Sequence, residues 1–217
     1  MKKTFLTFLG IGFLLLSLQN PMLFIFPMWI FVLLFKPTLE EVFAYFSHGR
    51  GFIVAGLTLG LLTEIFAILN NLDLPPDERI LLHPEPIPDL IYALFYYTIL
   101  ILTWYLLLRK IKFSKTDIFL LTGIFGIFTE EVGAVFLRIF SEPITGLLYA
   151  LIIVFVYGIF PMLAYMITEE GFSTERSQPR IHHYLLAALA LFFQYAIYGN
   201  FIYTTLEHFF GWWFPIK

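Results

Sequence analysis

The stretch Gly123-Ile-Phe-Gly-Ile-Phe-Thr-Glu-Glu-Val-Gly-Ala-Val-Phe-Leu-Arg138 is as apolar as a membrane-spanning helix, yet it carries two adjacent carboxylates, Glu130 and Glu131. A charged residue at the centre of such a helix costs roughly 2.5 to 3.5 kcal/mol, whereas each Leu, Ile, Phe or Val contributes only about 0.3 to 0.6 kcal/mol in favour of insertion. Two acids therefore offset about ten apolar side chains. We expect the rest of the chain to surround this segment with protein.

The composition indicates the class of protein. The chain has 217 residues, of which 59% are hydrophobic and 13% charged, and its mean hydropathy is +0.83. A soluble domain has about 25% charged residues and could not bury this much apolar surface in one core. Repeated apolar runs separated by short charged loops predict an all-α polytopic membrane bundle, forming a single integral membrane domain over 1-217.

Several kinds of site and partner are not expected. The sequence contains no cysteine, which excludes disulfides, thiolate metal sites and a cysteine nucleophile. It has no basic block typical of nucleic-acid binding, and no motif for a cofactor or a metal ion. The expected partners are the lipid bilayer and a small solute, ion or lipid, and oligomerisation is left open.

The apolar segments predict about seven transmembrane helices. Residues 4–35 are too long for one span, so we expect a helical hairpin that turns near Asn20-Pro21, because Pro21 suits the start of a helix better than its interior. Two short spans and a re-entrant hairpin are both compatible with this segment. A loop with a short interfacial helix is expected over 36–50. The other expected spans are 51–71, 89–108, 116–138, 144–167 and 184–206.

Basic residues predict the orientation in the cell membrane. With seven spans and a cytoplasmic N-terminus, ten of the thirteen Lys and Arg residues fall on cytoplasmic segments. The remaining three are Arg79, Arg138 and Lys217. The positive-inside rule therefore favours a cytoplasmic N-terminus and an external C-terminus.

Two segments that contain the acids resemble each other. Gly60-Leu-Leu-Thr-Glu64-Ile-Phe-Ala67 aligns without a gap with Gly126-Ile-Phe-Thr-Glu130-Glu-Val-Gly133. Farther along the chain, Glu85-Pro-Ile-Pro-Asp-Leu-Ile-Tyr-Ala-Leu94 matches Glu142-Pro-Ile-Thr-Gly-Leu-Leu-Tyr-Ala-Leu151.

The two matches keep their order, which predicts a duplicated two-helix hairpin. Its copies would be 51–108 and 116–167, with 184–206 as a further span. Parallel repeats of this kind occur in transporters, whose sites lie between the repeats near the middle of the membrane.

The two acids are expected to face the bundle interior. Small or polar residues share their helical faces, namely Gly60, Ala67 and Asn71 for Glu64 and Gly126, Gly133 and Ala134 for Glu130. Small residues let helices approach closely. No Lys, Arg or His lies at the same depth, and Arg138 is expected to extend outward, so burial favours the protonated form of the carboxyls. Thr63, Thr129, Gln194 and Asn200 are expected to bind the same ligand.

Three functions remain open, and the sequence names no substrate or reaction. The first is a small proton- or cation-coupled transporter that uses Glu64 and Glu130. The second is an intramembrane enzyme acting on a lipid or isoprenoid substrate, with Glu130 and Glu131 as catalytic acid and base. The third is a non-catalytic assembly or scaffold protein whose acids hydrogen-bond between helices, each worth about 1 kcal/mol.

Overall fold

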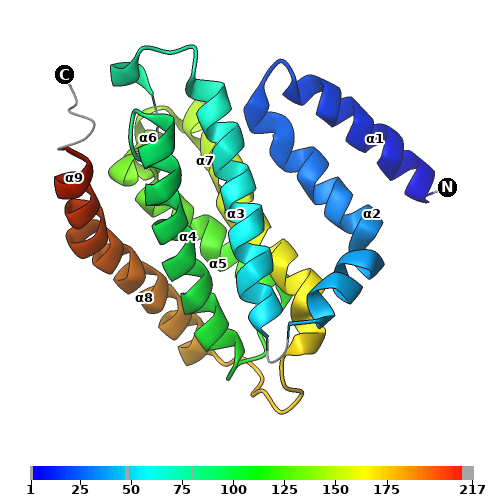
Figure 1. The fold of residues 1–217 in the computed structure, drawn as a ribbon. Helices are drawn as coiled ribbons and strands as arrows, with labels where there is room; N and C mark the ends of the chain where they lie inside the picture. Colours follow the sequence, from blue (N-terminus) through cyan, green and yellow to red (C-terminus); the bar gives the residue numbers. More distant parts are fainter. Residues whose placement is uncertain (1, 47–48, 80, 212–217) are drawn as a thin grey trace.

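The computed structural model describes residues 2–46, 49–79 and 81–211 (Figure 1). In these ranges the chain is all-helical, apart from an isolated bridge between Ile111 and Ser177. The helices in chain order are α1 (Lys2–Ser17), α2 (Ile25–Ala44), α3 (Arg50–Asn71), α4 (Pro86–Leu108), α5 (Lys115–Thr129), α6 (Ala134–Ser141), α7 (Pro143–Thr168), α8 (Ile181–Ile197) and α9 (Thr204–Gly211). The predicted all-α class is confirmed.

Five helical segments of the described chain are long and apolar enough to cross a membrane, which fits a multi-pass membrane protein. They are Arg50–Asn71, Pro86–Leu108, Lys115–Ser141, Pro143–Gly171 and Ile181–Phe210. Helix α1 is apolar but shorter, and α2 carries Lys36, Glu40 and Glu41. The predicted count of seven is therefore not confirmed, and the two N-terminal helices account for the difference.

Local sequence signals explain where the long helices begin. Pro86 and Pro143 open α4 and α7, where a missing backbone N–H costs nothing. At α5, Ser114 accepts a hydrogen bond from the Asp117 N–H, and the Asp117 side chain accepts one from the Ser114 N–H. This reciprocal cap satisfies two of the backbone donors that a helix start leaves free.

Helices α3, α4, α5 and α7 form the centre of the bundle (Figure 1). Helix α5 packs along α7, α3 packs against both α4 and α7, and α8 lies against α4 and α5. The α1–α2 hairpin lies on the other side, against α3 and α7. Glycines at the contacts allow this close approach: a Cβ at Gly56 would lie 2.4 Å from Ile101, and one at Gly158 would lie 2.4 Å from the Phe119 carbonyl oxygen.

The N-terminal hairpin turns where it was predicted to turn. Helix α1 ends at Ser17, and Pro21 opens a short 3₁₀ turn, Pro21–Phe24, that leads into α2. The expected loop over 36–50 is wrong in its first part, because α2 continues to Ala44 with Pro37 inside it. The ion pair between Lys36 and Glu40, one helical turn apart, supports this continuation.

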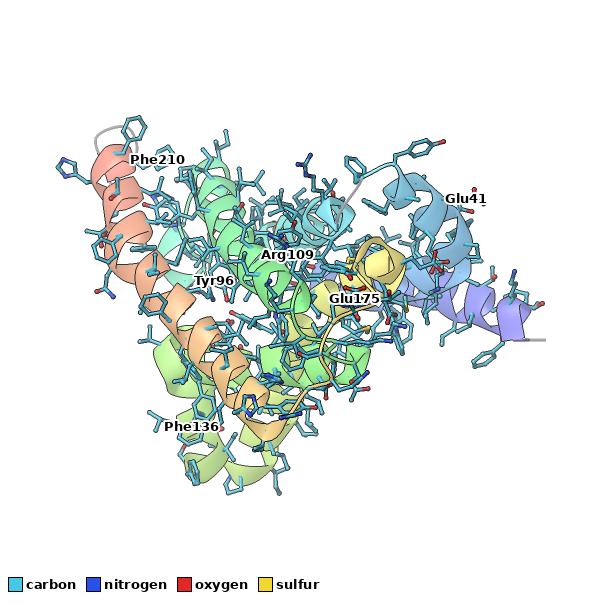
Figure 2. The ribbon with its side chains drawn as sticks, turned by 90° about the horizontal axis from the view of Figure 1, so that it is seen from below. Glu41, Tyr96, Arg109, Phe136, Glu175 and Phe210 are labelled. Carbon is cyan, nitrogen blue, oxygen red and sulfur yellow. The ribbon has the colours of Figure 1, made fainter. Side chains whose placement is uncertain are left out.

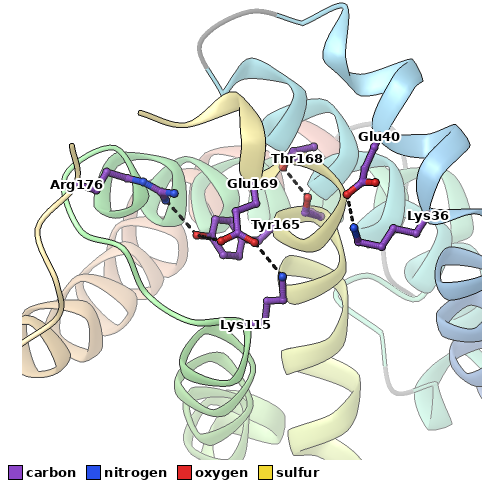
Figure 3. Close-up of polar contacts among 8 residues, drawn as sticks. Lys36, Glu40, Lys115, Tyr165, Thr168, Glu169 and Arg176 are labelled. Carbon is purple, nitrogen blue, oxygen red and sulfur yellow. Dashed lines mark hydrogen bonds and ion pairs between the residues drawn. The ribbon is translucent and has the colours of Figure 1, made fainter. Parts of the chain in front are cut away.

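A charged cluster joins α5, α7 and the segment before α8 at one end of the bundle (Figure 3). Lys115 Nζ lies 2.9 Å from Glu169 Oε2. The Tyr165 hydroxyl donates to Glu169 Oε1 over 3.4 Å and accepts from Arg176 Nη1 over 3.1 Å. Arg176 also donates to the Leu108 carbonyl oxygen over 3.3 Å. The carboxylate of this cluster therefore has cations beside it, unlike the interior acids of the bundle.

Candidate functional site

Glu64 lies on α3 and receives a hydrogen bond from the next long helix. The Tyr97 hydroxyl of α4 donates to Glu64 Oε2 over 2.8 Å. Gly60 makes this contact possible, because it lies one turn before Glu64 and a Cβ there would be 2.9 Å from Cγ of Tyr97. A larger side chain at position 60 would push the tyrosine away from the carboxyl.

The same contact occurs between α5 and α7. The Tyr157 hydroxyl of α7 donates to Glu130 Oε2, and a Cβ at Gly126 would lie 2.5 Å from Cγ of Tyr157. In both helix pairs, therefore, a glycine admits a tyrosine ring whose hydroxyl binds the glutamate four residues after the glycine. We call this arrangement the Gly–Tyr–Glu contact.

The helix that carries Glu130 is broken at the acid pair. Helix α5 ends at Thr129, and Glu131 and Val132 have left-handed backbone angles, with φ of 47° and 54°. Gly133 comes next with φ of 87°, and α6 begins at Ala134. The expectation of one continuous helix over 116–138, with Gly133 and Ala134 on the face of Glu130, is therefore wrong. Left-handed conformations cost non-glycine residues roughly 1–2 kcal/mol each.

Next to the break, Glu131 has hydrogen-bond partners of its own. Arg138 Nη1 and Nη2 donate to the two Glu131 carboxylate oxygens over 3.3 and 2.6 Å. The Tyr149 hydroxyl also donates to Glu131 Oε1, over 3.2 Å. The expectation that Arg138 extends outward is wrong, because the break brings it back to Glu131. This carboxylate already has a cation as its partner.

The acids of the two helix pairs are close enough to influence each other. The Glu64 side chain interacts electrostatically with both Asp89 and Glu130. Tyr96 interacts with both Glu64 and Glu130, and Figure 2 shows it between α4 and α8. The Tyr96 hydroxyl is buried and has no hydrogen-bond partner among the described residues. We call this group of interacting side chains, which come from several helices, the acid site.

Helix α8 and the turn after it bring tyrosines to the acid site, since Tyr195 interacts with Glu130 and Tyr198 with Glu64. Gln194 is 3% exposed, and neither of its amide atoms has a hydrogen-bond partner in the described part of the chain. The Tyr195 hydroxyl donates to the Thr129 carbonyl oxygen over 3.4 Å, and the Tyr198 hydroxyl donates to the Tyr92 carbonyl oxygen over 3.2 Å. A π-helical turn comes next, Tyr198–Tyr203; such turns often occur at functional sites.

The other residues expected to bind a ligand lie in different places. The Thr129 hydroxyl donates to its own helix, at the Phe125 carbonyl oxygen over 3.1 Å, so this residue offers the site its carbonyl group. The Thr63 hydroxyl likewise donates to the Leu59 carbonyl oxygen over 3.0 Å. Asn200 is exposed and donates to the Ala196 carbonyl oxygen over 2.8 Å. The structure therefore does not bring Asn200 to the acid site.

Sequence reasoning missed the tyrosines that bind the acids. The downstream sequence match has an offset of 57 residues, since Tyr92 aligns with Tyr149. The two tyrosines of the Gly–Tyr–Glu contacts, Tyr97 and Tyr157, are instead 60 residues apart. The shift of almost one helical turn hides them from the alignment. The sequence feature that could have indicated them is the high tyrosine content of α4, which follows Glu64, and of α7, which follows Glu130.

An apolar groove of about 460 Å³ lies apart from the acid site. Residues of the α1–α2 hairpin, α3 and Ile167 line it, and its hydroxyl-bearing lining residues are Thr7 and Thr58. Both hydroxyls donate to carbonyl oxygens of their own helices, over 2.9 Å each. None of the described residues that line this groove is acidic.

No metal centre is indicated within the described ranges, which contain no group of three or more His, Cys, Asp or Glu placed to hold a metal ion. Comparison with known proteins adds no family, since no protein-family model, curated protein or solved structure matches this chain. The function must therefore be inferred from the side-chain geometry of the acid site.

Proposed function

We propose that this protein is a small membrane carrier coupled to the proton or another monovalent cation, with Glu64 and Glu130 as the groups that bind and release it. The observation that carries the proposal is the interaction between these two carboxyls, beside the buried Tyr96 hydroxyl, which lacks a hydrogen-bond partner among the described residues. Buried polar groups are ordinarily hydrogen-bonded, so unpartnered ones mark a place for an occupant. In the proposed topology the chain crosses the membrane seven times from a cytoplasmic N-terminus, as one domain.

The tyrosines suit carboxyls that change their protonation state. A tyrosine hydroxyl donates to an ionised carboxylate and accepts from a protonated one. Tyr97 and Tyr157 can therefore keep their contacts with Glu64 and Glu130 in both states. A group held in this way can exchange a proton without losing its position.

The break after Thr129 also fits a carrier. Non-helical backbone at membrane depth is tolerated where it is buried in protein or lines a cavity, and broken helices supply ion and substrate ligands in transporters. Here the break leaves the Thr129 carbonyl oxygen to accept from Tyr195 at the acid site. The same backbone group would be available to a bound cation.

The Gly–Tyr–Glu contact in both helix pairs supports the proposed duplication. The two copies would contribute one acid each to a shared site, as in carriers built from parallel repeats. The copies differ in the register of the tyrosine helix and in the break after Glu130.

The enzyme alternative has less support from the geometry. A lipid substrate would need an apolar groove that ends at Glu130 and Glu131, whereas the apolar groove is lined by residues of α1, α2 and α3 and by Ile167. Glu131 is also bound to Arg138 and Tyr149. The scaffold alternative is favoured by the hydrogen bonds to Glu64 and Glu130, which could simply join helices.

Proton flux in proteoliposomes tests the proposal. The purified protein is reconstituted with an internal pH dye, and flux is driven by a potassium diffusion potential and by gradients of Na⁺, K⁺ or Li⁺. Glu64→Gln and Glu130→Gln keep the shape and most hydrogen bonds but cannot exchange a proton. We expect each to slow the flux by roughly a factor of 10 or more.

The control variant is Glu142→Gln, which changes an exposed acid bound to Thr145. It should transport as the unmodified protein does. Full flux in both interior variants, or no flux through the unmodified protein under any gradient, would contradict the carrier and leave the scaffold alternative.

A further inference from the structure

We propose that Asp89 and Glu64 form a carboxyl pair that holds a single proton, at the end of the acid site nearest the α3–α4 loop. This inference adds a residue and a ligand to the acid site, and its role in transport rests on the proposed function. The existence of the pair can be tested without any transport measurement.

Asp89 is completely buried in the first turn of α4. Its Oδ1 accepts a hydrogen bond from the His83 backbone N–H over 2.9 Å. Its Oδ2 is also buried but has no hydrogen-bond partner within the described ranges. The side chain interacts with that of Glu64. One carboxylate oxygen of Asp89 is thus fixed, while the other is left open next to a second acid.

Among the described residues, no cation balances the two acids. The ion pairs in this part of the chain are Lys36–Glu40, Lys115–Glu169 and Arg138–Glu131, and none of them includes Asp89 or Glu64. His83 is the basic side chain beside the pair, but its Nδ1 accepts from the Glu85 N–H over 3.0 Å. A nitrogen that accepts a hydrogen bond has no proton to donate, so Nδ1 of His83 supplies no donor to the two acids.

The other titratable groups around the pair are acids or phenols. They come from every neighbouring element: Tyr96 and Tyr97 on α4, Glu130 after α5 and Tyr198 at the end of α8. Tyr97 already donates to Glu64 Oε2. None of these groups can supply a positive charge.

A single proton would remove the charge repulsion between the two acids and would also give Oδ2 of Asp89 a hydrogen-bond donor. Two ionised carboxylates side by side in a poorly solvated interior repel each other, and one bound proton removes this repulsion. The same proton provides the missing hydrogen-bond donor between Glu64 and Oδ2 of Asp89. The pair should therefore titrate as a unit, as interacting carboxyls do.

The position of the pair indicates its role. Glu64 lies seven residues before Asn71, the end of α3, which corresponds to about 10 Å along a helix. Asp89 lies in the first turn of the next long helix, and Glu64 interacts with Glu130 on the other side. The pair is thus the first acid group reached from the α3–α4 loop, from which a proton would pass to Glu130.

Infrared spectroscopy of the protonated carboxyl stretch, followed as a function of pH, tests the pair. In Asp89→Asn, Glu64 loses its anionic neighbour, so its upper titration step should move by about one pH unit or more to lower pH. Glu64→Gln should have the same effect on Asp89, which provides a second measurement if one variant does not fold. Glu142→Gln serves as the control and should leave the interior titration unchanged. If Glu64 titrates identically in the unmodified protein and in Asp89→Asn, the proposal of a carboxyl pair is wrong.

The flux assay separates this inference from the proposed function. If the titration depends on Asp89 while Glu64→Gln transports normally, the pair exists and the carrier proposal fails. If Glu64→Gln and Glu130→Gln abolish the flux while Asp89→Asn leaves the titration unchanged, the carrier stands and the pair is rejected.

Discussion

The pairs α3–α4 and α5–α7 contain the same Gly–Tyr–Glu contact but differ in the residues that come after the glutamate. After Glu64, helix α3 continues, and the next residue, Ile65, is 39% exposed on the apolar surface. After Glu130 comes a second acid, and the helix breaks. In an uninterrupted helix Glu131 would point where Ile65 points, toward lipid. The comparison shows that an intact helix can bury one acid, whereas two adjacent acids require a change of backbone.

A continuous helix and a broken helix at the two acids would have similar energetic costs. An ionised acid directed into hydrocarbon costs roughly 2.5 to 3.5 kcal/mol, and two left-handed non-glycine residues cost about 2 to 4 kcal/mol together. The break also gives Glu131 a two-oxygen contact with Arg138 and a hydrogen bond from Tyr149. These contacts stabilise the broken helix relative to the continuous one.

The largest effect is expected from a larger side chain in place of the glycine of each Gly–Tyr–Glu contact. Gly126→Leu should destabilise the protein by about 3 kcal/mol, because overpacking here forces the Tyr157 ring off Glu130. Gly60→Leu should destabilise it less, since a Cβ there meets Tyr97 at 2.9 Å, against 2.5 Å at Gly126. Unfolding in detergent micelles by a denaturing surfactant would measure both. Equal losses would show that the two contacts are packed alike.

Removing the tyrosine hydroxyls should have a smaller effect. Tyr157→Phe and Tyr97→Phe each leave a partly buried carboxyl oxygen without its donor, which costs about 1 to 2 kcal/mol. We expect Tyr97→Phe to cost more, because Glu64 lies on an intact helix and cannot reorient as readily as Glu130 at a break. Thermal unfolding of the two variants in the same detergent gives the comparison. A larger loss for Tyr157→Phe would show that the break does not relax.

The smallest effect concerns the break itself. Val132 is 93% exposed and has φ of 54°, so Val132→Gly should stabilise the protein by about 1 kcal/mol by removing the left-handed strain. Leu69→Gly, at a 45% exposed site inside the intact α3, should instead destabilise it by about 1 kcal/mol. Unfolding free energies of both variants test this difference in sign. A destabilising Val132→Gly would mean that α5 and α6 join into one helix.

The sequence pointed to candidate acids but not to the groups that lie beside them. Glu64, Glu130 and Gln194 were expected in the interior; Gln194 is buried, and the partly buried Glu64 and Glu130 interact with each other. Tyr97 was missed, because nothing in an apolar helix with many tyrosines indicates which one faces an acid. The contact of Asp89 with Glu64 was missed, because the two acids lie on different helices. Arg138 was misplaced for a different reason, since a helical spacing of seven residues does not apply across a break.

By itself, the sequence determined the all-helical class, the membrane location and the turn at Pro21, because apolar runs, charge spacing and proline act locally. Only the tertiary structure decided that α5 breaks after Thr129 and that Glu131 returns to Arg138. It also decided that Asp89 lies beside Glu64. These features depend on which buried groups find partners on other helices, and the energy of a buried acid is set by such neighbours and not by its own sequence context.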